Sequence, residues 1–474
     1  IHTKLDNKPN CSIIRYFKAK KRHSKTSPNG CNFFDYDGWI MTQTILNFKL
    51  ESTNEKLTPR TGVAIFGEYL KGMNFESFCN KNLPISNHHK AYSPFEFIYP
   101  LILMLHSGGR VLDDIREIRL DTALSTLLKM ENIPTASAFT KYLHRHGTEG
   151  EEGIKSINKQ YLKRFLKSIK NEELILDIDA SFIEAHKSTA EWSYKGAPGY
   201  MPMIGHINNG WVIDADFRDG NEAPANENLE FIKQCQLQLP IGTKFDRVRI
   251  DSAGYQAAIF NHCDKEEMLF TISGRKDKSV WASINAIKED DWETLSKREK
   301  ISEFIHTMND TDNAFRMIVV KKDITPVLTG MESCIPEEVK EQQKDEMYYC
   351  VATNDNDLTA IEIVKLHRQR GETSENKIKE LKNGFNMSYL PTSNFEANSF
   401  YFAIGTLAYN LFLLFKQILD KNLQQHTVKT IRYKLYNIAG KVISHARETV
   451  LKVNNQFMEL LQNIRIRAYR MSLE

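Results

Sequence analysis

The segment Leu174-Ile175-Leu176-Asp177-Ile178-Asp179 is the stretch that decides the fold. Four of its six residues are apolar, which predicts a short buried strand that ends in carboxylates. Side chains two positions apart point to the same face of a strand, so Asp177 and Asp179 would lie on one side of the sheet. Because an isolated buried carboxylate is costly, this pair requires a cation or hydrogen-bond donors nearby.

A second strand, Arg247-Val248-Arg249-Ile250-Asp251, also ends in an aspartate. Asn208-Asn209-Gly210, between two apolar runs, is a hairpin signal. The order from residue 174 onward is a strand, a hairpin pair, a helix, a strand, a helix and a strand. The expected strands are 174–179, 201–207, 211–217, 247–251 and 269–272, and the first expected helix is 226–239. This order predicts an α/β core on a mixed sheet.

Helical patterns flank this core on both sides. In residues 60–166, helix starts are expected at Ser93-Pro94-Phe95-Glu96 and at Thr135-Ala136-Ser137, with a break at Gly108-Gly109. Residues 395–474 are predicted to be helical to the end. Small helices separated by short turns suit a DNA-binding domain, and they suit any other helical bundle equally.

The composition excludes several classes of protein. The 474 residues are 41% hydrophobic and 26% charged, which is ordinary globular composition. Seven scattered cysteines without a CxxC pair speak against a zinc site and favour reduced thiols inside a cell. The most apolar stretch, residues 400–415, is short for a membrane span and contains Thr406 and Asn410. We therefore expect a buried helix there and no membrane partner.

Charge is nearly balanced over the whole chain, with a net value of +3, but it is uneven locally. Basic residues gather in residues 15–25 and 429–470, where they either neutralise phosphates or form solvated helix faces. The sequence has no Gly-rich phosphate loop followed by Lys and Ser or Thr, which speaks against an ATP-driven enzyme.

Asp179 and Asp251 are the first candidate site residues. Taken alone, each aspartate is better explained as a turn cap or as the N-cap of the following segment than as a ligand. Together they are more informative, because ligand sites in α/β sheets gather at the carboxyl ends of strands. Two neighbouring strands that each end in Asp would present hard oxygen ligands of the kind that Mg²⁺ prefers. A third carboxylate would complete a site for two metal ions.

Glu375 is the best third carboxylate, with Glu372 as its rival. On a helix, Glu375 shares one face with Lys379 and Lys382, while Ile378 anchors the helix to the sheet. Two more cations, Arg368 and Arg370, stand just before this helix. Carboxylates for metal and cations for phosphate form a coherent assembly for phosphodiester chemistry.

These segments resemble the signatures of DDE transposases from bacterial insertion sequences. Residues 370–382 are similar to the family's last-carboxylate motif, in which Lys382 matches the lysine and Arg368 or Arg370 the arginine. His367 stands where many members have tyrosine. Ile178-Asp179-Ala180-Ser181 is similar to the first-aspartate motif, with Asp177 as an alternative first ligand. Ile250-Asp251-Ser252-Ala253-Gly254-Tyr255 is similar to the second motif with one residue inserted.

The resemblance covers roughly residues 41–470 and implies a ribonuclease-H-like core with an insertion between Asp251 and Glu375. It implies that Asp179, Asp251 and Glu375 bind Mg²⁺, for which Mn²⁺ substitutes, and that Arg368, Arg370, Lys379 and Lys382 contact DNA. The implied partners are the terminal inverted repeats of a mobile element and a target duplex. A homodimer on DNA and a bacterial cytoplasmic location at the nucleoid follow from the same analogy.

The changes in pattern divide the chain into five expected regions. The chain begins with Ile1, and we expect its natural start at Met41. The regions are a disordered extension at 1–40, a helical DNA-binding domain at 41–166, a ribonuclease-H-like catalytic core at 167–275 and 347–395, a β-rich insertion at 276–346, and a C-terminal helical region at 396–474.

Three other functions remain open from the sequence alone. The first is a metal-dependent nuclease on the same core that cuts DNA without joining it. The second is a DNA-binding derivative of a transposase without catalysis. The third is a structural α/β protein whose carboxylates are fortuitous. Magnesium-dependent nicking, and strand transfer of pre-cut element ends, would separate these functions from transposition.

Overall fold

The computed structural model describes residues 46, 48, 50–85, 91–169, 172–207, 210–324, 345–371, 375–445 and 448–472. The chain divides into two compact units, Ile1–Asn54 and Glu55–Glu474. All of the described helices and strands belong to the second unit. The expected extension at 1–40, the start at Met41 and the rival acid Glu372 lie outside the described residues.

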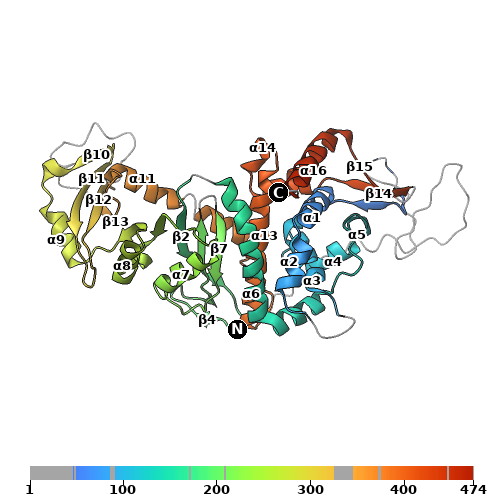
Figure 1. The fold of residues 1–474 in the computed structure, drawn as a ribbon, viewed down its shortest axis with the longest axis horizontal. Helices are drawn as coiled ribbons and strands as arrows, with labels where there is room; N and C mark the ends of the chain where they lie inside the picture. The colour runs from blue at the N-terminus through green and yellow to red at the C-terminus, as the bar shows by residue number, and fades with distance from the viewer. Residues whose placement is uncertain are drawn as a thin grey trace, which may run out of the picture. The chain divides into compact units, whose positions relative to one another are not determined.

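A nine-stranded mixed sheet forms the centre of this unit, in the order β10-β11-β12-β13-β9-β8-β2-β6-β7 (Figure 1). Its middle strands β2 (Ile175–Ala180), β8 (Arg247–Ile250) and β9 (Leu269–Gly274) run parallel. The expected hairpin is present as β6 (Met203–Ile207) and β7 (Trp211–Asp216), which pair antiparallel. The α/β core on a mixed sheet is therefore confirmed, and it is consistent with a ribonuclease-H-like fold flanked by helices.

The strands that follow β9 extend the same sheet. β13 pairs antiparallel with β9, and β12, β11 and β10 follow outward. Their bounds are β10 (Glu293–Ser296), β11 (Glu299–His306), β12 (Phe315–Asp323) and β13 (Glu346–Thr353). The pairing covers an edge of the parallel strands that would otherwise expose unpaired backbone groups. Helix α11 (Ala360–Arg370) packs on this extension and then leads back to the middle of the sheet.

Long helices close the other edge of the sheet, next to β7. Helix α6 (Ala136–Ser168) begins at the expected N-cap Thr135 and packs against α13 (Phe395–Gln417), as Figure 1 shows. Among the described helices, α13 alone is long and apolar enough to cross a membrane, but its apolar stretch is completely buried inside the protein. The expectation of a buried helix at residues 400–415 is therefore confirmed.

Two buried asparagines satisfy the backbone of the edge strand β7. Asn410 of α13 accepts a hydrogen bond from Val212 N at 2.9 Å and donates one to Val212 O at 2.7 Å. Asn158 of α6 donates to the same carbonyl at 3.1 Å and accepts from Asn410 at 2.7 Å. Because unsatisfied backbone groups of a buried edge are costly, these contacts fix the two helices against the sheet.

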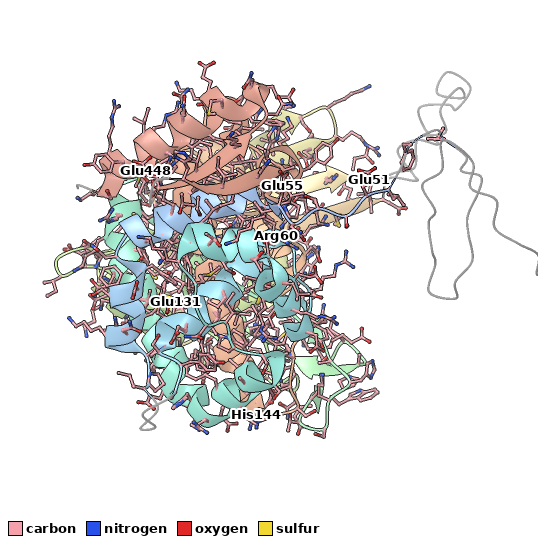
Figure 2. The ribbon with its side chains drawn as sticks, turned by 90° about the vertical axis from the view of Figure 1, so that its right-hand side faces the viewer. Glu51, Glu55, Arg60, Glu131, His144 and Glu448 are labelled. Atoms are coloured by element: carbon pink, nitrogen blue, oxygen red, sulfur yellow. The ribbon has the colours of Figure 1, made fainter. Side chains whose placement is uncertain are left out.

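The helices on the amino-terminal side match their sequence signals. Helix α3 (Pro94–Ser107) starts with the capping box of Ser93 and Glu96, and it ends at Gly108, whose φ of +95° requires glycine. Arg60, which is labelled in Figure 2, precedes α1 and forms an ion pair with Asp121, the N-cap of α5. The remaining helices of this side are α1 (Thr61–Gly72), α2 (Phe75–Asn82), α4 (Ile115–Leu120) and α5 (Thr122–Leu128).

The expectation that residues 395–474 are helical to the end is wrong. Strands β14 (Gly440–His445) and β15 (Glu448–Val453) form a hairpin, and β1 (Lys56–Thr58) adds to it as a third strand. Both strands contain β-branched residues, Val442 and Ile443 in β14 and Thr449, Val450 and Val453 in β15, which favour extended structure. The helical segments of this region are α13, α14 (Lys421–Gln424), α15 (Val428–Ile431) and α16 (Met458–Ser472), together with a π-helical turn at Arg432–Tyr436.

Candidate active site

The register of the two central parallel strands aligns Asp179 with Asp251. Ile178 of β2 lies opposite Ile250 of β8, so the next residue of each strand is an aspartate at the same end of the sheet. Parallel strands bring their carboxyl ends to one edge, which is where α/β proteins bind ligands. Both aspartates are half-buried there.

The electrostatics of Asp179 locate the third acid. The pKa of the Asp179 carboxyl is raised, first by burial and further by the negative charges of Asp251 and Glu375, against the lowering effect of Arg370. Like charges raise a carboxyl pKa only when they are close, so both acids lie within electrostatic range of Asp179. Glu375 is exposed at the start of α12 (Asn376–Gly384). Asp251 and Glu375 thus lie within electrostatic range of Asp179, and a site shared by the three carboxylates stays a prediction.

Asp251 also has the structural role that the sequence left open. Its Oδ1 accepts a hydrogen bond of 2.8 Å from Ala253 N, and it caps the short helix Ser252–Gly254. The cap fixes the direction of the carboxylate with one of its two oxygens. The capping and ligand interpretations of this residue are therefore compatible, because a carboxylate has several lone pairs.

Arg370, the last residue of α11, is the cation nearest to the acids. Its Nη2 lies 3.3 Å from Asp179 Oδ1 and donates a hydrogen bond of 3.1 Å to Ile178 O. Its Nε is buried and has no hydrogen-bond partner among the described residues. Gly371 and Glu375 both have π-helical backbone, a conformation that is frequent at functional sites.

Asp177, the alternative first ligand, is fully engaged in a buried ion pair. Its two carboxylate oxygens accept hydrogen bonds of 2.8 and 2.7 Å from Nε and Nη2 of Arg249, and its side chain has no exposed area. A bidentate pair of this kind is strong and directional. Asp177 therefore balances a structural charge, and Asp179 is the aspartate of β2 that faces the acidic group.

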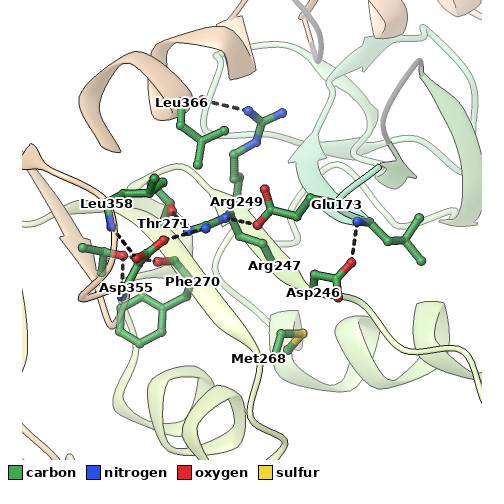
Figure 3. A network of polar contacts seen from close by, with 12 residues as sticks. Glu173, Asp246, Arg247, Arg249, Met268, Phe270, Thr271, Asp355, Leu358 and Leu366 are labelled. Carbon is green, nitrogen blue, oxygen red and sulfur yellow. Dashed lines mark hydrogen bonds and ion pairs between the residues drawn. The ribbon is translucent and has the colours of Figure 1, made fainter. Parts of the chain in front are cut away.

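The same arginine positions the helix that carries Arg370. Arg249 Nη1 donates a hydrogen bond of 2.7 Å to Leu366 O in the last turn of α11 (Figure 3). It thereby links β2, β8 and α11 through one side chain. The sequence predicted a strand at Arg249 but no role for its side chain. The feature that could have indicated a role is a charged residue inside an apolar strand, two positions before Asp251.

Arg247 forms a parallel network one step along the same face of β8. It contacts Glu173 at 2.7 Å, Asp355 at 2.7 Å and the hydroxyl of Thr271 at 3.1 Å, as Figure 3 shows. The arginine and Asp355 are both buried. Asp355 in turn accepts hydrogen bonds from the backbone of Asp357 and Leu358, just before α11. The two arginines of β8 therefore fix both ends of α11 relative to the sheet.

Lys382 is the second cation of the site. Its ammonium donates to Ser181 Oγ at 3.1 Å and to Phe182 O at 2.6 Å, directly after the first aspartate. Burial lowers the Lys382 pKa, and the charge of Asp179 opposes that shift. Lys382 and Arg370 thus stand around Asp179, as the sequence pattern predicts for residues that meet a phosphate.

The other two expected DNA contacts lie elsewhere. Arg368 forms a bidentate ion pair with Glu299 of β11, at 2.9 and 3.1 Å, and its guanidinium lies 5.1 Å from the ring centre of Tyr349. Lys379 is exposed on α12, and no contact joins it to the carboxylates. Neither residue is brought to Asp179, so their contacts with DNA stay predictions.

His367 occupies the position where the resemblance expects an aromatic residue. Its Nε2 lies 2.9 Å from the Ser273 hydroxyl on β9. Burial and the positive charges of Arg370 and Arg249 lower the pKa of His367 to about 4, so the imidazole is neutral at physiological pH. His367 therefore packs beneath the site without adding charge to it.

The side chains of the site fit divalent cations in their chemistry. Asp179, Asp251 and Glu375 offer hard oxygen ligands, and their mutual repulsion favours a bound cation. In the described residues, however, no three His, Cys, Asp or Glu side chains already form a metal cluster. The positive charge next to Asp179 comes instead from Arg370, whose Nη2 lies 3.3 Å from Asp179 Oδ1. A cation bound at this carboxylate would compete electrostatically with Arg370.

Comparison with known proteins identifies one family. The family model described as transposase DDE domain group 1 matches residues 44–465. This span includes the sheet, the three carboxylates, and the helices on both sides. A search among curated proteins finds no match.

The two aspartates of β2 should respond oppositely to neutralisation. Asp177→Asn leaves the Arg249 charge buried without its partner and should destabilise the protein by about 3–5 kcal/mol. Asp179→Asn removes a carboxylate whose raised pKa makes its ionised form unfavourable, so at neutral pH it should stabilise the protein. That gain should vanish as the pH falls below about 4, where aspartates are protonated. Urea denaturation of both variants across pH measures these changes, and equal destabilisation by both would contradict the assignment.

Proposed function

The chain belongs to the family of transposase DDE domains, and from this premise we propose that it cleaves DNA at the terminal inverted repeats of an insertion sequence and transfers the freed strand into target DNA. The observation that carries the proposal is the register of β2 and β8, which aligns Asp179 with Asp251 at one end of the sheet, with Glu375 within electrostatic range of Asp179. A grouping of three acids so far apart in sequence supports a cation site.

Asp179, Asp251 and Glu375 are the residues that would hold the metal ions, Mg²⁺ or Mn²⁺. Bound there, the ions would supply Lewis-acid activation of the attacking oxygen and neutralise charge at the scissile phosphate. The cap on Asp251 and the strand end at Asp179 preset the directions of two carboxylates. Glu375, on the helix, completes the set.

Arg370 and Lys382 would bind phosphate oxygens on either side of the cut. Both side chains carry positive charge at Asp179 before DNA arrives. With cations held by the carboxylates, the attraction between Arg370 and Asp179 would weaken, and the Arg370 guanidinium would be available to bind a phosphate. The Arg370 guanidinium would thus exchange its carboxylate partner, Asp179, for a phosphate of the DNA. This account needs no covalent protein–DNA intermediate, so it assigns no Ser or Tyr nucleophile.

Two element ends must be cut together, so we expect a homodimer on duplex DNA, located in the bacterial cytoplasm at the nucleoid. Arg368 and Lys379 would contribute to DNA contacts outside the acidic group. A metal-dependent nuclease and a DNA-binding derivative without catalysis share the same site. Strand transfer of pre-cut element ends distinguishes transposition from both.

Glu375→Gln should abolish Mg²⁺-dependent cleavage of inverted-repeat DNA, with a loss of several orders of magnitude in rate, while binding of that DNA stays nearly unchanged. The substitution keeps size and hydrogen bonding but removes a charged ligand. The matched control Glu459→Gln, an exposed position on α16, should cleave like the wild type. Nicking in a gel assay and binding by fluorescence anisotropy measure both effects. Retained cleavage by Glu375→Gln would refute its role as a ligand.

Arg370→Gln should strengthen Mn²⁺ binding in the absence of DNA, because the guanidinium then no longer competes for Asp179. A partly exposed ion pair contributes up to about 1 kcal/mol, so the gain should reach up to about fivefold. Cleavage of DNA should nevertheless fall, since a phosphate contact is lost. Arg368→Gln is the control for Mn²⁺ binding alone, because that arginine pairs with Glu299 instead of Asp179. Weaker Mn²⁺ binding by Arg370→Gln, followed by electron paramagnetic resonance, would contradict the competition.

A further inference from the structure

A small three-stranded sheet follows the first aspartate and has no role in the site described so far. Its strands are β3 (Ile183–Glu184), β5 (Pro198–Tyr200) and β4 (Glu191–Trp192), in that order. β3 begins four residues after Asp179, so the chain can separate the two by no more than about 14 Å. The Lys382 contacts with Ser181 and Phe182 bind this connection to α12.

Large aromatic side chains are exposed on and beside this sheet. Trp192 is 67% exposed and Tyr194 is 64% exposed, and Tyr389, in the segment after α12, is 41% exposed. By contrast, Tyr200 on the central strand β5 is completely buried. Single exposed aromatics are ordinary, but several gathered near a candidate site indicate a surface that meets a partner.

Two lysines accompany these rings. Lys195 Nζ lies 5.0 Å from the ring centre of Tyr194, and Lys187 Nζ lies 5.7 Å from that of Tyr389. The Thr189 hydroxyl, close to Lys187 in sequence, donates to Ser393 O at 2.9 Å, which ties the sheet to the segment that carries Tyr389. We call the set of Trp192, Tyr194, Tyr389, Lys187 and Lys195 the aromatic platform.

The acidic residues of the small sheet lie on its other face. Glu184, Gly199 and Glu191 are directly opposite one another across the three strands, so their side chains share a face. Trp192 lies opposite Pro198, one residue along, and therefore points to the opposite face. Glu184 Oε1 lies 3.0 Å from His186 Nε2. The face that carries Trp192 is thus separated from the sheet's negative charges.

We propose that the aromatic platform binds unpaired nucleotides of the DNA end next to the cleavage site. The inference rests on the proposed function, because DNA at the carboxylates is its premise. Every base has a flat face that stacks on Trp or Tyr, and lysines beside the rings meet the phosphates. In a duplex these faces are hidden between neighbouring base pairs. Exposed rings therefore fit DNA only where its strands have separated, as at a freshly cut end.

The test compares two DNA substrates by fluorescence anisotropy in EDTA, so that no cleavage occurs. One is a blunt inverted-repeat duplex, and the other is the same duplex with a short single-stranded extension. The wild type should prefer the extended duplex. Trp192→Ala should lower affinity for it by about tenfold or more, the effect of one lost stacked base, and should leave the blunt duplex nearly unaffected. Trp192→Phe, which keeps a ring, should restore most of the preference.

Tyr469→Ala is the matched control, because Tyr469 on α16 is also 67% exposed and lies outside the platform. Its affinity for both substrates should equal that of the wild type. An equal loss on both substrates for Trp192→Ala, or no loss on either, would overturn the proposal and leave the rings as a protein-contact surface. Since the assay contains no metal, a preference that depends on Trp192 would stand even if Glu375→Gln proved cleavage-competent. The binding assay therefore tests the aromatic platform, and the cleavage assay tests the carboxylates, independently of each other.

Discussion

The structure depends on the buried ion pair between Asp177 and Arg249. Two hydrogen bonds join β2 to β8 through this pair, and a third joins Arg249 to Leu366 in α11. The pair sits one residue before the matched positions Ile178 and Ile250, so it holds the register that puts Asp179 beside Asp251. Because separating such a pair costs several kcal/mol, the strand ends have little freedom to slip. Asp177 and Arg249, which are not candidate ligands themselves, thus determine the positions of the candidate ligands Asp179 and Asp251.

This register places negatively charged carboxylates, which repel one another, at one edge of the sheet. Asp179 is partly buried and close to two other acids, which raises its pKa, and Arg370 offsets part of the cost. Functional sites commonly carry such unfavourable groupings, which the surrounding fold must support. Here the support comes from Arg247 and Arg249, which fix α11, and from the asparagines of α6 and α13, which fix β7. In this structure, the guanidinium of Arg370 offsets part of the negative charge of Asp179.

The order of core strands could be predicted because each carries a local signal, such as the apolar run before Asp179 or the Asn-Gly turn before β7. The three acids could be chosen because each stands at the end of an element. The hairpin β14–β15 was missed because its pattern is short and adjoins helices. The separation of Arg368 from Arg370 was also beyond the sequence, since it depends on the position of Glu299 on a distant strand. Asp177 and Asp179 are equivalent by pattern, and only the partner Arg249 distinguishes them.

The central claim is that Asp179, Asp251 and Glu375 form one cation site. The most direct measurement is the binding of Mn²⁺ by electron paramagnetic resonance to the wild type and to Asp179→Asn, Asp251→Asn and Glu375→Gln. If the carboxylates share the ions, each single substitution should weaken binding, and a second substitution among the three should add less than the first because the site is already broken. Wild-type affinity in any one of the three single variants would contradict the claim.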